Sequence, residues 1–344
     1  MNDRFLRACR REPVDMTPVW FMRQAGRYMK NFRDIRAKHS LLTVCKTPDL
    51  ATEVTLQPIE RFNFDASIIF ADILLPLEPM GLHLEFVKGE GPVIHNRIQD
   101  AADIHALRPV VPEESLSYVM QAIRQVRSAL KVPLIGFAGA PFTLASYMIE
   151  GGSSRNYIDT KKMMYGAPKL WNTLMEKLTR VLSDYLAAQV SAGAQVLQIF
   201  DSWIGALSPG DYVAYVFPHM KRLFSDLQKC DVPLIHFGTG TTTLLKLQKE
   251  AGGNVIGLDW RIHLDEGWQI LGDDVAVQGN LDPVTLFAPI PEIEKRVDDI
   301  LKRAANRPGH IFNLGHGILP LTPNESVEAV IEMVHQKSAR PFPS

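Results

Sequence analysis

The sequence predicts an α/β protein built as a closed (β/α)8 TIM barrel, in one domain over residues 1–344. Eight short apolar runs recur along the chain, longer amphipathic stretches separate them, and no linker, repeat or low-complexity segment interrupts the order. Strands that alternate with helices form parallel β/α units, and eight units favour a closed barrel over an open doubly wound sheet. The chain exceeds the roughly 250 residues typical of this barrel, so we expect insertions.

The eight apolar runs are bounded by Gly, Pro or Asp. They are apolar at consecutive positions, as in strands buried on both faces. In chain order they cover residues 19–22, 66–71, 134–138, 195–200, 234–237, 255–258, 275–278 and 311–314.

Two of the intervening helices have recognisable starts. Ser208-Pro209-Gly210-Asp211 predicts a helix that runs to about Gln228, and Thr322-Pro323-Asn324-Glu325 predicts one that runs to about Lys337. Each start combines a hydroxyl cap, a proline at the first helical position and an acid at the third.

One insertion is visible in the sequence. Residues 82–87 and 93–98 flank the segment Lys88-Gly89-Glu90-Gly91-Pro92. Two short runs around such a turn predict a β-hairpin after the second strand.

Charge and cysteine content exclude several classes of protein. With 37 Lys and Arg against 38 Asp and Glu, the net charge is −1, which argues against a nucleic-acid or acidic-membrane binder. The separated Cys9, Cys45 and Cys230 fit a reducing compartment and exclude a disulfide framework. No secretory signal or apolar run of spanning length is visible, so we expect a cytoplasmic protein.

Polar and glycine-rich segments follow the predicted strands, at the end of a barrel where active sites form. In chain order they are residues 23–28, Asp72, residues 139–143 with Tyr147 beyond, residues 201–203, 238–240, 259–260, 279–282 and 315–317.

The pair Arg23 and Arg27 flanks an Ala-Gly turn after the first strand. A guanidinium group can donate two parallel hydrogen bonds to one carboxylate, so this pair can hold a multiply charged anion. Two ordinary surface arginines, or two structural ion pairs, are the alternative.

Three acids, Asp72, Asp201 and Asp259, stand at strand ends. A carboxylate between apolar runs must be paired, hydrogen-bonded or functional. Asp72 is therefore a candidate catalytic residue, with a helix cap or an internal partner for an arginine as the alternative. Spacing alone does not rank the three acids.

His316, between two glycines, is a candidate acid, base or hydrogen-bond donor, or else a histidine that binds backbone. His236 lies inside a strand and is expected in the core. Tyr147 either points into the site or is a buried helix tyrosine. Ser202 lacks the nucleophile-elbow context, so a hydrolase is not predicted.

Two other site types are not supported. Gly238-Thr239-Gly240 with Asp259 about 20 residues on imitates a dinucleotide fingerprint, but Thr243 replaces the third glycine. No H-E-x-x-H, C-x-x-C or comparable zinc pattern occurs, so no metal site is predicted.

Five segments together resemble the uroporphyrinogen decarboxylase family. The first is Pro18-Val19-Trp20-Phe21-Met22-Arg23-Gln24-Ala25-Gly26-Arg27-Tyr28, and the second is Gly139-Ala140-Pro141-Phe142-Thr143-Leu144 followed by residues 147–152. Residues 70–74, 200–203 and 312–317 match further family segments in the same order. One departure is Ser153, where the family often has a third consecutive glycine.

The resemblance implies a single-domain (β/α)8 barrel, a cytoplasmic homodimer, and no metal or organic cofactor. It implies a carboxy-lyase that removes CO2 from the four acetate side chains of uroporphyrinogen III to give coproporphyrinogen III, for haem and related tetrapyrroles. Carried over residue by residue, the substrate contacts are Arg23, Gln24, Ala25, Gly26, Arg27, Asp72, Tyr147, Ser202 and His316. Asp72, Arg23 and Arg27 are the expected catalytic residues.

Two other functions fit parts of the pattern. A corrinoid or thiol methyltransferase on a related barrel would need a zinc-holding thiolate cluster, which three separated cysteines do not suggest. A non-catalytic tetrapyrrole-binding protein would keep the strand-end residues without turnover.

Overall fold

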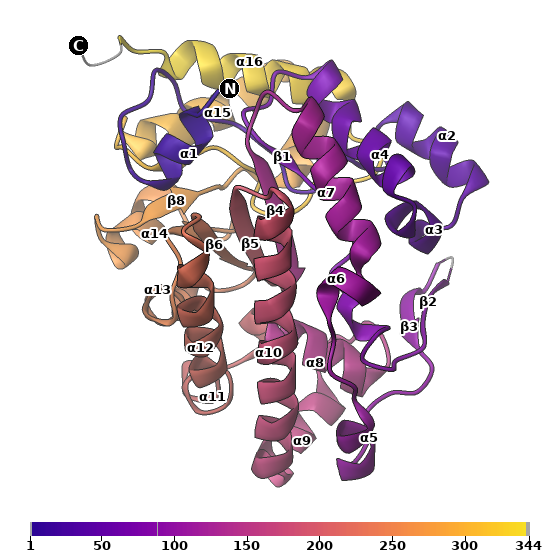
Figure 1. Cartoon of the computed structure of the whole chain (residues 1–344). Coiled ribbons are helices and arrows are strands. Elements are labelled where there is room, and N and C mark those ends of the chain that lie inside the picture. Colours follow the sequence, from indigo (N-terminus) through magenta and orange to yellow (C-terminus); the bar gives the residue numbers. More distant parts are fainter. Residues whose placement is uncertain (1, 88, 342–344) are drawn as a thin grey trace.

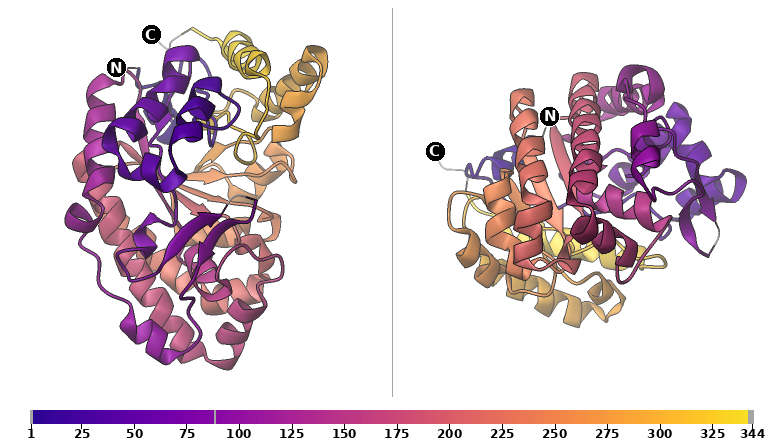
Figure 2. Two further views of the ribbon diagram at one scale, coloured as in Figure 1. Left: turned by 90° about the vertical axis from the view of Figure 1, so that its right-hand side faces the viewer. Right: turned by 90° about the horizontal axis from the view of Figure 1, so that it is seen from below.

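The computed structural model describes residues 2–87 and 89–341. Within them, seven parallel strands form one curled sheet in the order β1-β4-β5-β6-β7-β8-β9, and helices surround it (Figures 1 and 2). The strands are β1 (Ser67–Ile68), β4 (Leu134–Gly139), β5 (Val196–Asp201), β6 (Leu234–Gly238), β7 (Val255–Gly257), β8 (Ala276–Gln278) and β9 (His310–Ile311). The predicted α/β barrel class is confirmed, with seven regular strands instead of eight.

The segment predicted as the first strand, residues 19–22, is not a regular strand, but it lies where that strand belongs. Val19 forms an isolated parallel bridge with Phe312. The amide of Phe312 donates to the carbonyl of Pro18 (2.9 Å), and the amide of Asp65 donates to the carbonyl of Val19 (2.8 Å). The segment therefore connects the β9 edge to the β1 edge.

The second and last predicted strands are shorter than expected because side chains replace strand partners at their ends. In the predicted strand 66–71, the amide of Phe70 donates to the hydroxyl of Thr55 (2.9 Å). Beyond β9, the side-chain oxygen of Asn313 accepts the amides of Met22 (3.1 Å) and Leu314 (2.7 Å).

The helices cover the outside of the sheet. They are α1 (Arg4–Cys9), α2 (Lys30–Lys38), α3 (Leu41–Lys46), α4 (Pro48–Arg61), α5 (Ala101–Ala106), α6 (Pro112–Ser115), α7 (Ser117–Ala129), α8 (Pro141–Glu150), α9 (Ile158–Gly166), α10 (Pro168–Ala192), α11 (Pro209–Tyr215), α12 (Phe217–Leu227), α13 (Leu245–Ala251), α14 (Leu264–Leu271), α15 (Ile290–Ala304) and α16 (Asn324–Ser338). Short 3-10 turns are η1 (Leu75–Leu77), η2 (Ile204–Ala206), η3 (Gln228–Cys230), η4 (Thr242–Leu244) and η5 (Pro283–Phe287).

Helix α10 illustrates how the sequence builds this outer layer. It begins with Pro168 at its first position and ends at Gly193, whose φ of 124° a side chain would strain. Leu174, Leu178 and Val181 recur every three or four residues and are buried. This spacing puts one apolar stripe against the sheet.

The first predicted helix start is confirmed, although that helix is shorter than predicted, and the second start is wrong. The hydroxyl of Ser208 accepts the amide of Asp211 as expected, but the helix breaks at Val216. Pro218 explains the break, since it has no amide to donate to the carbonyl of Ala214, four residues before it. The second predicted cap is wrong: α16 begins at Asn324, and the Thr322 hydroxyl donates to the carbonyl of Leu319 instead.

The predicted hairpin insertion is confirmed. Strands β2 (Leu84–Val87) and β3 (Gly91–Ile94) pair antiparallel after β1 and η1. Lys88, which we placed in its turn, lies outside the described residues. The hairpin stands on the right in Figure 1 and crosses in front of the sheet in the left view of Figure 2.

A polar chain runs through the interior of the sheet. The indole of Trp20 donates to Gln278 (2.9 Å), and the Gln278 amide donates to Gln198 (3.1 Å). All three side chains are essentially buried. The chain links the closing segment to β8 and β5 from inside.

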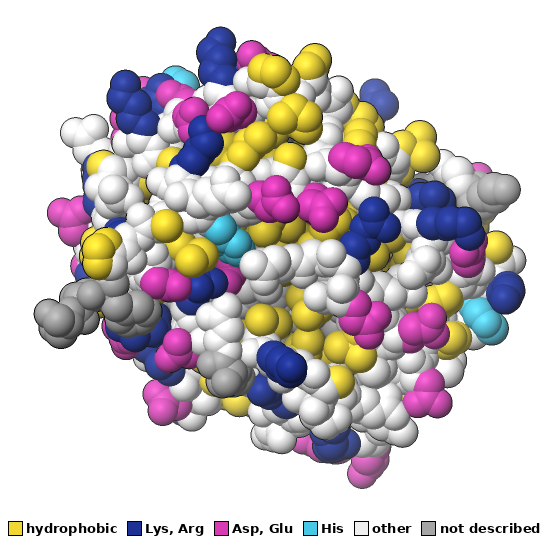
Figure 3. All heavy atoms as spheres, turned by 90° about the horizontal axis from the view of Figure 1, so that it is seen from above, with side chains coloured by type: hydrophobic (Ala, Val, Ile, Leu, Met, Phe, Trp, Pro, Cys, Tyr) yellow, Lys and Arg dark blue, Asp and Glu magenta, His cyan; other side chains and the backbone are white. Residues whose placement is uncertain are grey.

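On the face shown in Figure 3, acidic and basic side chains are interspersed. None of the helices in the described ranges is both long and apolar enough to cross a lipid bilayer.

Candidate active site

The loop that carries the arginine pair is shaped by Gln24 and Tyr28. Gln24 is fully buried; its side chain accepts the amide of Phe21 (3.1 Å) and donates to the carbonyl of Ala66 (3.1 Å). The Tyr28 hydroxyl donates to the Gln24 carbonyl (2.6 Å). The Gln24 side chain is thus engaged in holding the loop to the barrel. The Gln24 amide also donates to the carbonyl of Phe21 (3.0 Å), so the backbone polar groups of this buried residue are engaged as well.

Arg23 extends from this loop across the last strand end. Its backbone has a φ of 62°, and its side chain is exposed. A Cβ added at Gly317 would lie 2.6 Å from Cδ of Arg23, so the arginine stem lies directly over that glycine. A Cβ at Gly26 would lie 2.8 Å from the Arg23 carbonyl oxygen, which explains the glycine in the turn.

Arg27 lies beside helix α2. Its side chain is exposed, and Nη1 of Arg33 in α2 donates to its carbonyl oxygen (3.0 Å). The pKa of Arg36 is lowered by burial and by the charge of Arg27. The predicted pair therefore divides: Arg23 faces the strand ends, and Arg27 faces α2.

Asp72 follows β1 and is half-buried. Its Oδ1 accepts the amide of Leu74 (2.9 Å), so the predicted capping role is real. Burial raises the pKa of Asp72, while the Leu74 amide and the charge of Arg23 oppose that rise. The same carboxylate thus caps a turn and interacts with Arg23.

Of the three acids at strand ends, Asp72 is the one that a ligand can reach. Asp201 is fully buried, and Asp259 is 2% exposed. Asp259 accepts the amides of Gly240 (2.6 Å) and Arg261 (2.9 Å). It thereby shapes the loop that imitates a dinucleotide fingerprint.

Tyr147 on α8 completes the group around Asp72. Burial and the Asp72 carboxylate raise the pKa of its phenol, and Ser153, Arg23 and Trp203 oppose the rise. Its ring centroid lies 5.9 Å from that of Trp203. Ser153, the departure from the family pattern, therefore lies beside a predicted site residue.

Ser202 lies in the turn after β5 and is half-buried. Its carbonyl accepts the hydroxyl of Thr239 (2.5 Å), and the amide of the next residue, Trp203, donates to Thr143 (3.5 Å). Since Trp203 packs on Tyr147, this turn adjoins the group around Asp72.

His316 is half-buried between Gly315 and Gly317. Burial, Arg23 and Arg261 lower its pKa, so its imidazole is neutral at pH 7; the Gly317 backbone and Asp259 act in the opposite direction. A Cβ at Gly315 would lie 2.5 Å from the amide nitrogen of Trp260, so this glycine lets two strand-end loops meet.

Sequence reasoning missed Arg261. Its guanidinium lies 4.1 Å from the centroid of Trp260 and forms an ion pair of 2.5 Å with Asp259. Trp260 in turn meets the ring of His316 edge-on at 6.5 Å. The only signal was its position two residues after a strand-end aspartate.

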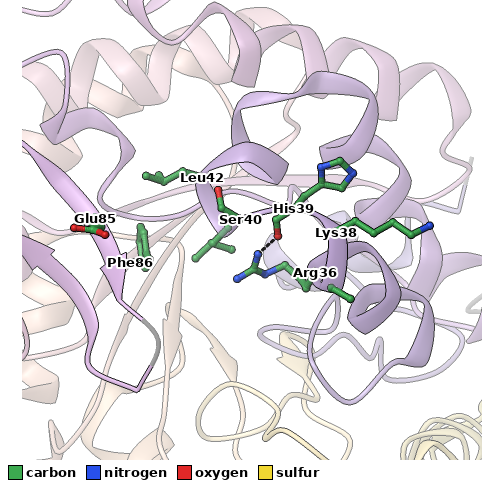
Figure 4. A pocket seen from close by; sticks show the side chains of 9 residues that line it. Arg36, Lys38, His39, Ser40, Leu42, Glu85 and Phe86 are labelled. Atoms are coloured by element: carbon green, nitrogen blue, oxygen red, sulfur yellow. Dashed lines mark hydrogen bonds between the residues drawn. The ribbon is translucent and has the colours of Figure 1, made fainter.

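A cavity of about 500 Å³ lies next to Arg36 of α2 (Figure 4). It is lined by residues of α2, α3 and the hairpin, including Arg36, His39, Ser40, Glu85 and Phe86. Arg36 brings it next to Arg27. None of the predicted site residues lines it.

Burial raises the pKa of each of the three cysteine thiols, and for Cys45 the Asp72 carboxylate adds to that rise. Over residues 2–87 and 89–341, no three His, Cys, Asp or Glu side chains gather as metal ligands would.

The family model described as uroporphyrinogen decarboxylase (URO-D) matches residues 1–337. The chain belongs to the uroporphyrinogen decarboxylase family. The resemblance seen in the five sequence segments is thereby confirmed.

Curated relatives of this family match almost the whole chain. A uroporphyrinogen decarboxylase from Sorangium cellulosum is 58% identical over 337 residues, which cover 97% of this chain and 96% of the relative. One from Solibacter usitatus is 55% identical, with 98% of each chain covered. One from Trichlorobacter lovleyi is 53% identical, with 99% and 100% covered.

Solved structures of a methyltransferase and of a methionine synthase share the fold. A methyltransferase from Methanosarcina mazei has a TM-score of 0.81 at 20% identity and covers 98% of each chain. A B12-independent methionine synthase from Shewanella sp. W3-18-1 has a TM-score of 0.52 at 12% identity, with 83% and 85% covered. At these identities the likeness concerns architecture alone.

Proposed function

We propose that the chain removes CO2 from the four acetate side chains of uroporphyrinogen III and releases coproporphyrinogen III. Membership in the uroporphyrinogen decarboxylase family supports the reaction class. The observation within the chain that carries the proposal is the electrostatic coupling of Arg23 to Asp72, Tyr147 and His316 at the strand ends.

The reaction needs a place for the electron pair of the bond that breaks. A proton adds to the pyrrole carbon next to the one that bears the acetate, and the ring becomes cationic. The bond between the methylene and the carboxylate then breaks, CO2 leaves, and the electron pair neutralises the ring. A proton added to the methylene and one lost from the ring carbon give a methyl group, so one proton is consumed per CO2.

Asp72 supplies the stabilising charge in this scheme. Its carboxylate accepts hydrogen bonds from the pyrrole N–H groups and stabilises the positive charge that develops on the ring. The Leu74 amide and Arg23 favour the ionised form against the effect of burial. Tyr147 and Ser202 complete the orientation of the substrate.

Arg23 and Arg27 bind the acetate and propionate carboxylates, for which guanidinium groups are well shaped. Arg23 interacts with both Asp72 and His316, so it holds the carboxylate of the reacting acetate. Arg27 holds a carboxylate of the substrate that lies farther from Asp72. Ala25 and Gly26 contribute loop backbone between the two arginines, and Gln24 holds that loop to the barrel. An arginine is a poor acid, and the lowered pKa leaves the His316 imidazole neutral, so a water held beside His316 delivers the proton.

Three further proposals accompany this function. The whole chain, residues 1–344, forms one catalytic domain, which the single contiguous hydrophobic core supports. The protein acts in the cytoplasm, in the supply of haem and related tetrapyrroles. It works as a homodimer and uses no metal or organic cofactor.

Product analysis by mass spectrometry tests the function. The purified chain is incubated anaerobically with chemically reduced uroporphyrin III and a chelator. Stepwise loss of CO2 down to the tetracarboxylate is the expected result. Binding of the substrate without loss of CO2 would instead identify a tetrapyrrole-binding protein. If the chain neither binds the substrate nor releases CO2 from it, the proposal is refuted.

A further inference from the structure

A buried acid and a buried histidine face each other beneath the turn that carries Ser202. Asp201 is the last residue of β5, and His236 is in the middle of β6, the neighbouring strand. Both side chains have 0% exposure, and Oδ2 of Asp201 lies 3.6 Å from Nε2 of His236. The proposed function uses neither residue.

The contacts of His236 define how many hydrogens the pair must hold. Its Nδ1 lies 3.3 Å from the carbonyl oxygen of Gln248, which can only accept, so Nδ1 carries a hydrogen. Its Nε2 faces the Asp201 carboxyl group. If Asp201 were ionised and Nε2 bare, two acceptors would face each other, so a further proton must lie between them.

The net charge of the pair leads to the same conclusion, that Asp201 and His236 hold one further proton between them. An ionised carboxylate with a neutral histidine would leave one net negative charge in the protein interior, which is costly. Among the described residues, no Lys or Arg is found among the groups that act on the Asp201 carboxyl group. The elements around the pair present Thr143 from α8, Tyr212 from α11, Phe224 from α12 and Gln248 from α13. Tyr212 is the one titratable side chain among these four.

The polar atoms here are unusually short of partners. Within the described part of the chain, both carboxylate oxygens of Asp201, Nε2 of His236 and the hydroxyl of Tyr212 are buried and make no hydrogen bond of ordinary geometry. Burial raises the pKa of Asp201, while His236 and Thr143 oppose that rise. A hydrogen bond or ion pair between the Asp201 carboxyl group and Nε2 of His236 is the remaining way to compensate these buried groups for the loss of hydrogen bonds to water.

This pair connects directly to the candidate site. Asp201 precedes Ser202, and Thr143, which faces the Asp201 carboxyl group, also accepts the amide of Trp203 (3.5 Å). Trp203 packs against Tyr147. A change in the direction of the Asp201 side chain therefore moves the turn that holds Ser202 and supports Tyr147.

We propose that Asp201 and His236 share one proton, and that this neutral pair is a positioning element for the turn carrying Ser202. The positioning half of the inference rests on the proposed function, whereas the shared proton does not. The acid supplies a hydrogen to Nε2 and the histidine supplies one to the Gln248 carbonyl, so the turn is fixed without a net buried charge.

The conservative variant Asp201→Asn separates this role from a purely structural one. Its amide NH2 group can donate to Nε2 as the shared proton does, so we expect kcat/KM to stay within about threefold of wild type. Asp201→Ala removes the donor, and we expect a loss of about 10- to 100-fold in kcat/KM, mainly through KM, since small displacements at a site have such effects. Asp226→Asn, a surface carboxylate on α12 paired with Arg222, is the matched control.

Nuclear magnetic resonance on the full-length chain tests the proton itself. Nitrogen-15 shifts of His236 are assigned with His236→Gln, and the carbon-13 shift of the Asp201 carboxyl with Asp201→Asn. We expect one of two patterns at pH 7: an imidazolium beside a carboxylate, or a neutral imidazole with hydrogen on Nδ1 beside a carboxylic acid. A neutral imidazole beside a carboxylate overturns the proposal.

The kinetic comparison of the Asp201 variants tests the positioning role independently of the resonance measurement. If Asp201→Asn is as impaired as Asp201→Ala, the positioning role of the neutral pair is refuted. If the wild-type chain releases no CO2 from uroporphyrinogen, the proposed function has failed, and the resonance measurement alone decides whether the proton is shared.

Discussion

Nε2 of His335 donates a 2.7 Å hydrogen bond to Oδ2 of Asp65, although the two residues are 270 positions apart in the chain. The same carboxylate accepts the amide of Val19 (2.8 Å) and the side chain of Asn2 (3.1 Å), and it pairs with Arg4. Asp65 is 1% exposed. One buried acid therefore joins α1, the closing segment and α16.

Replacing this acid should destabilise the whole fold. In Asp65→Ala, Arg4 loses one partner and the Val19 amide is left without its acceptor. We expect the free energy of unfolding to fall by about 3–5 kcal/mol, as for a broken buried pair. Urea unfolding measures it, with Asp34→Asn on the surface of α2 as the control. A loss below about 1 kcal/mol would contradict this role for Asp65.

Asp72→Asn should keep the fold and lose turnover. The amide oxygen can still accept the Leu74 amide, which bonds to Oδ1 in the wild type. The negative charge opposite the substrate is lost, and we expect kcat to fall by about 100-fold or more. Circular dichroism and CO2 release are measured together. Near-normal turnover would remove Asp72 from the mechanism.

Gly317→Ala should displace the Arg23 side chain without replacing any charged residue. The new Cβ would lie 2.6 Å from Cδ and 2.8 Å from Cγ of Arg23, so the arginine must move. If Arg23 binds a substrate carboxylate, KM should rise by about 10-fold, which corresponds to about 1.4 kcal/mol of binding. Gly166→Ala is the control, because no atom lies within 4 Å of a Cβ there. Equal KM values for the two variants would refute the arrangement.

Arg261→Gln should raise the pKa of His316. The Arg261 cation lowers that pKa and the Asp259 carboxylate raises it, so loss of the cation and release of Asp259 act in the same direction. A proton resonance titration of the His316 ring measures the shift toward the ordinary value. An unchanged or lower pKa would show that Arg261 and His316 are not coupled.

His310 should make stability depend on pH. Burial lowers its pKa from 6.5 to about 4, and its Nε2 lies 3.1 Å from the Gly279 carbonyl. The unfolded chain takes up the proton first as pH falls. The contribution of a neutral His310 is therefore complete above pH 6.5 and is lost between about 6.5 and 4, amounting to roughly 3 kcal/mol.

Thermal unfolding from pH 7 to pH 4.5 checks this dependence. In His310→Gln the titrating group is absent, so Tm should fall less steeply with decreasing pH than in the wild type. Parallel curves for the two proteins would show that another group governs acid stability.

Local sequence patterns were sufficient for the strands and for the family. Continuous apolar runs identified seven strands in their correct order, because consecutive residues are apolar in a strand that is buried on both faces of a parallel sheet. The same signal was insufficient for residues 19–22, where partners from Asn313 and Asp65 replace the regular ladder. Pro218 was visible in the sequence and indicated the break in the predicted helix.

The sequence by itself determined which chemical groups stand at the strand ends: two arginines, three acids, a tyrosine and a histidine. Tertiary structure alone decided their access and their partners. It left Asp72 reachable, enclosed Asp201 with His236, and turned Arg23 toward Gly317 while Arg27 faced α2. Strand and helix signals depend on neighbours in the chain, whereas exposure and pairing depend on distant residues that fill the surrounding space.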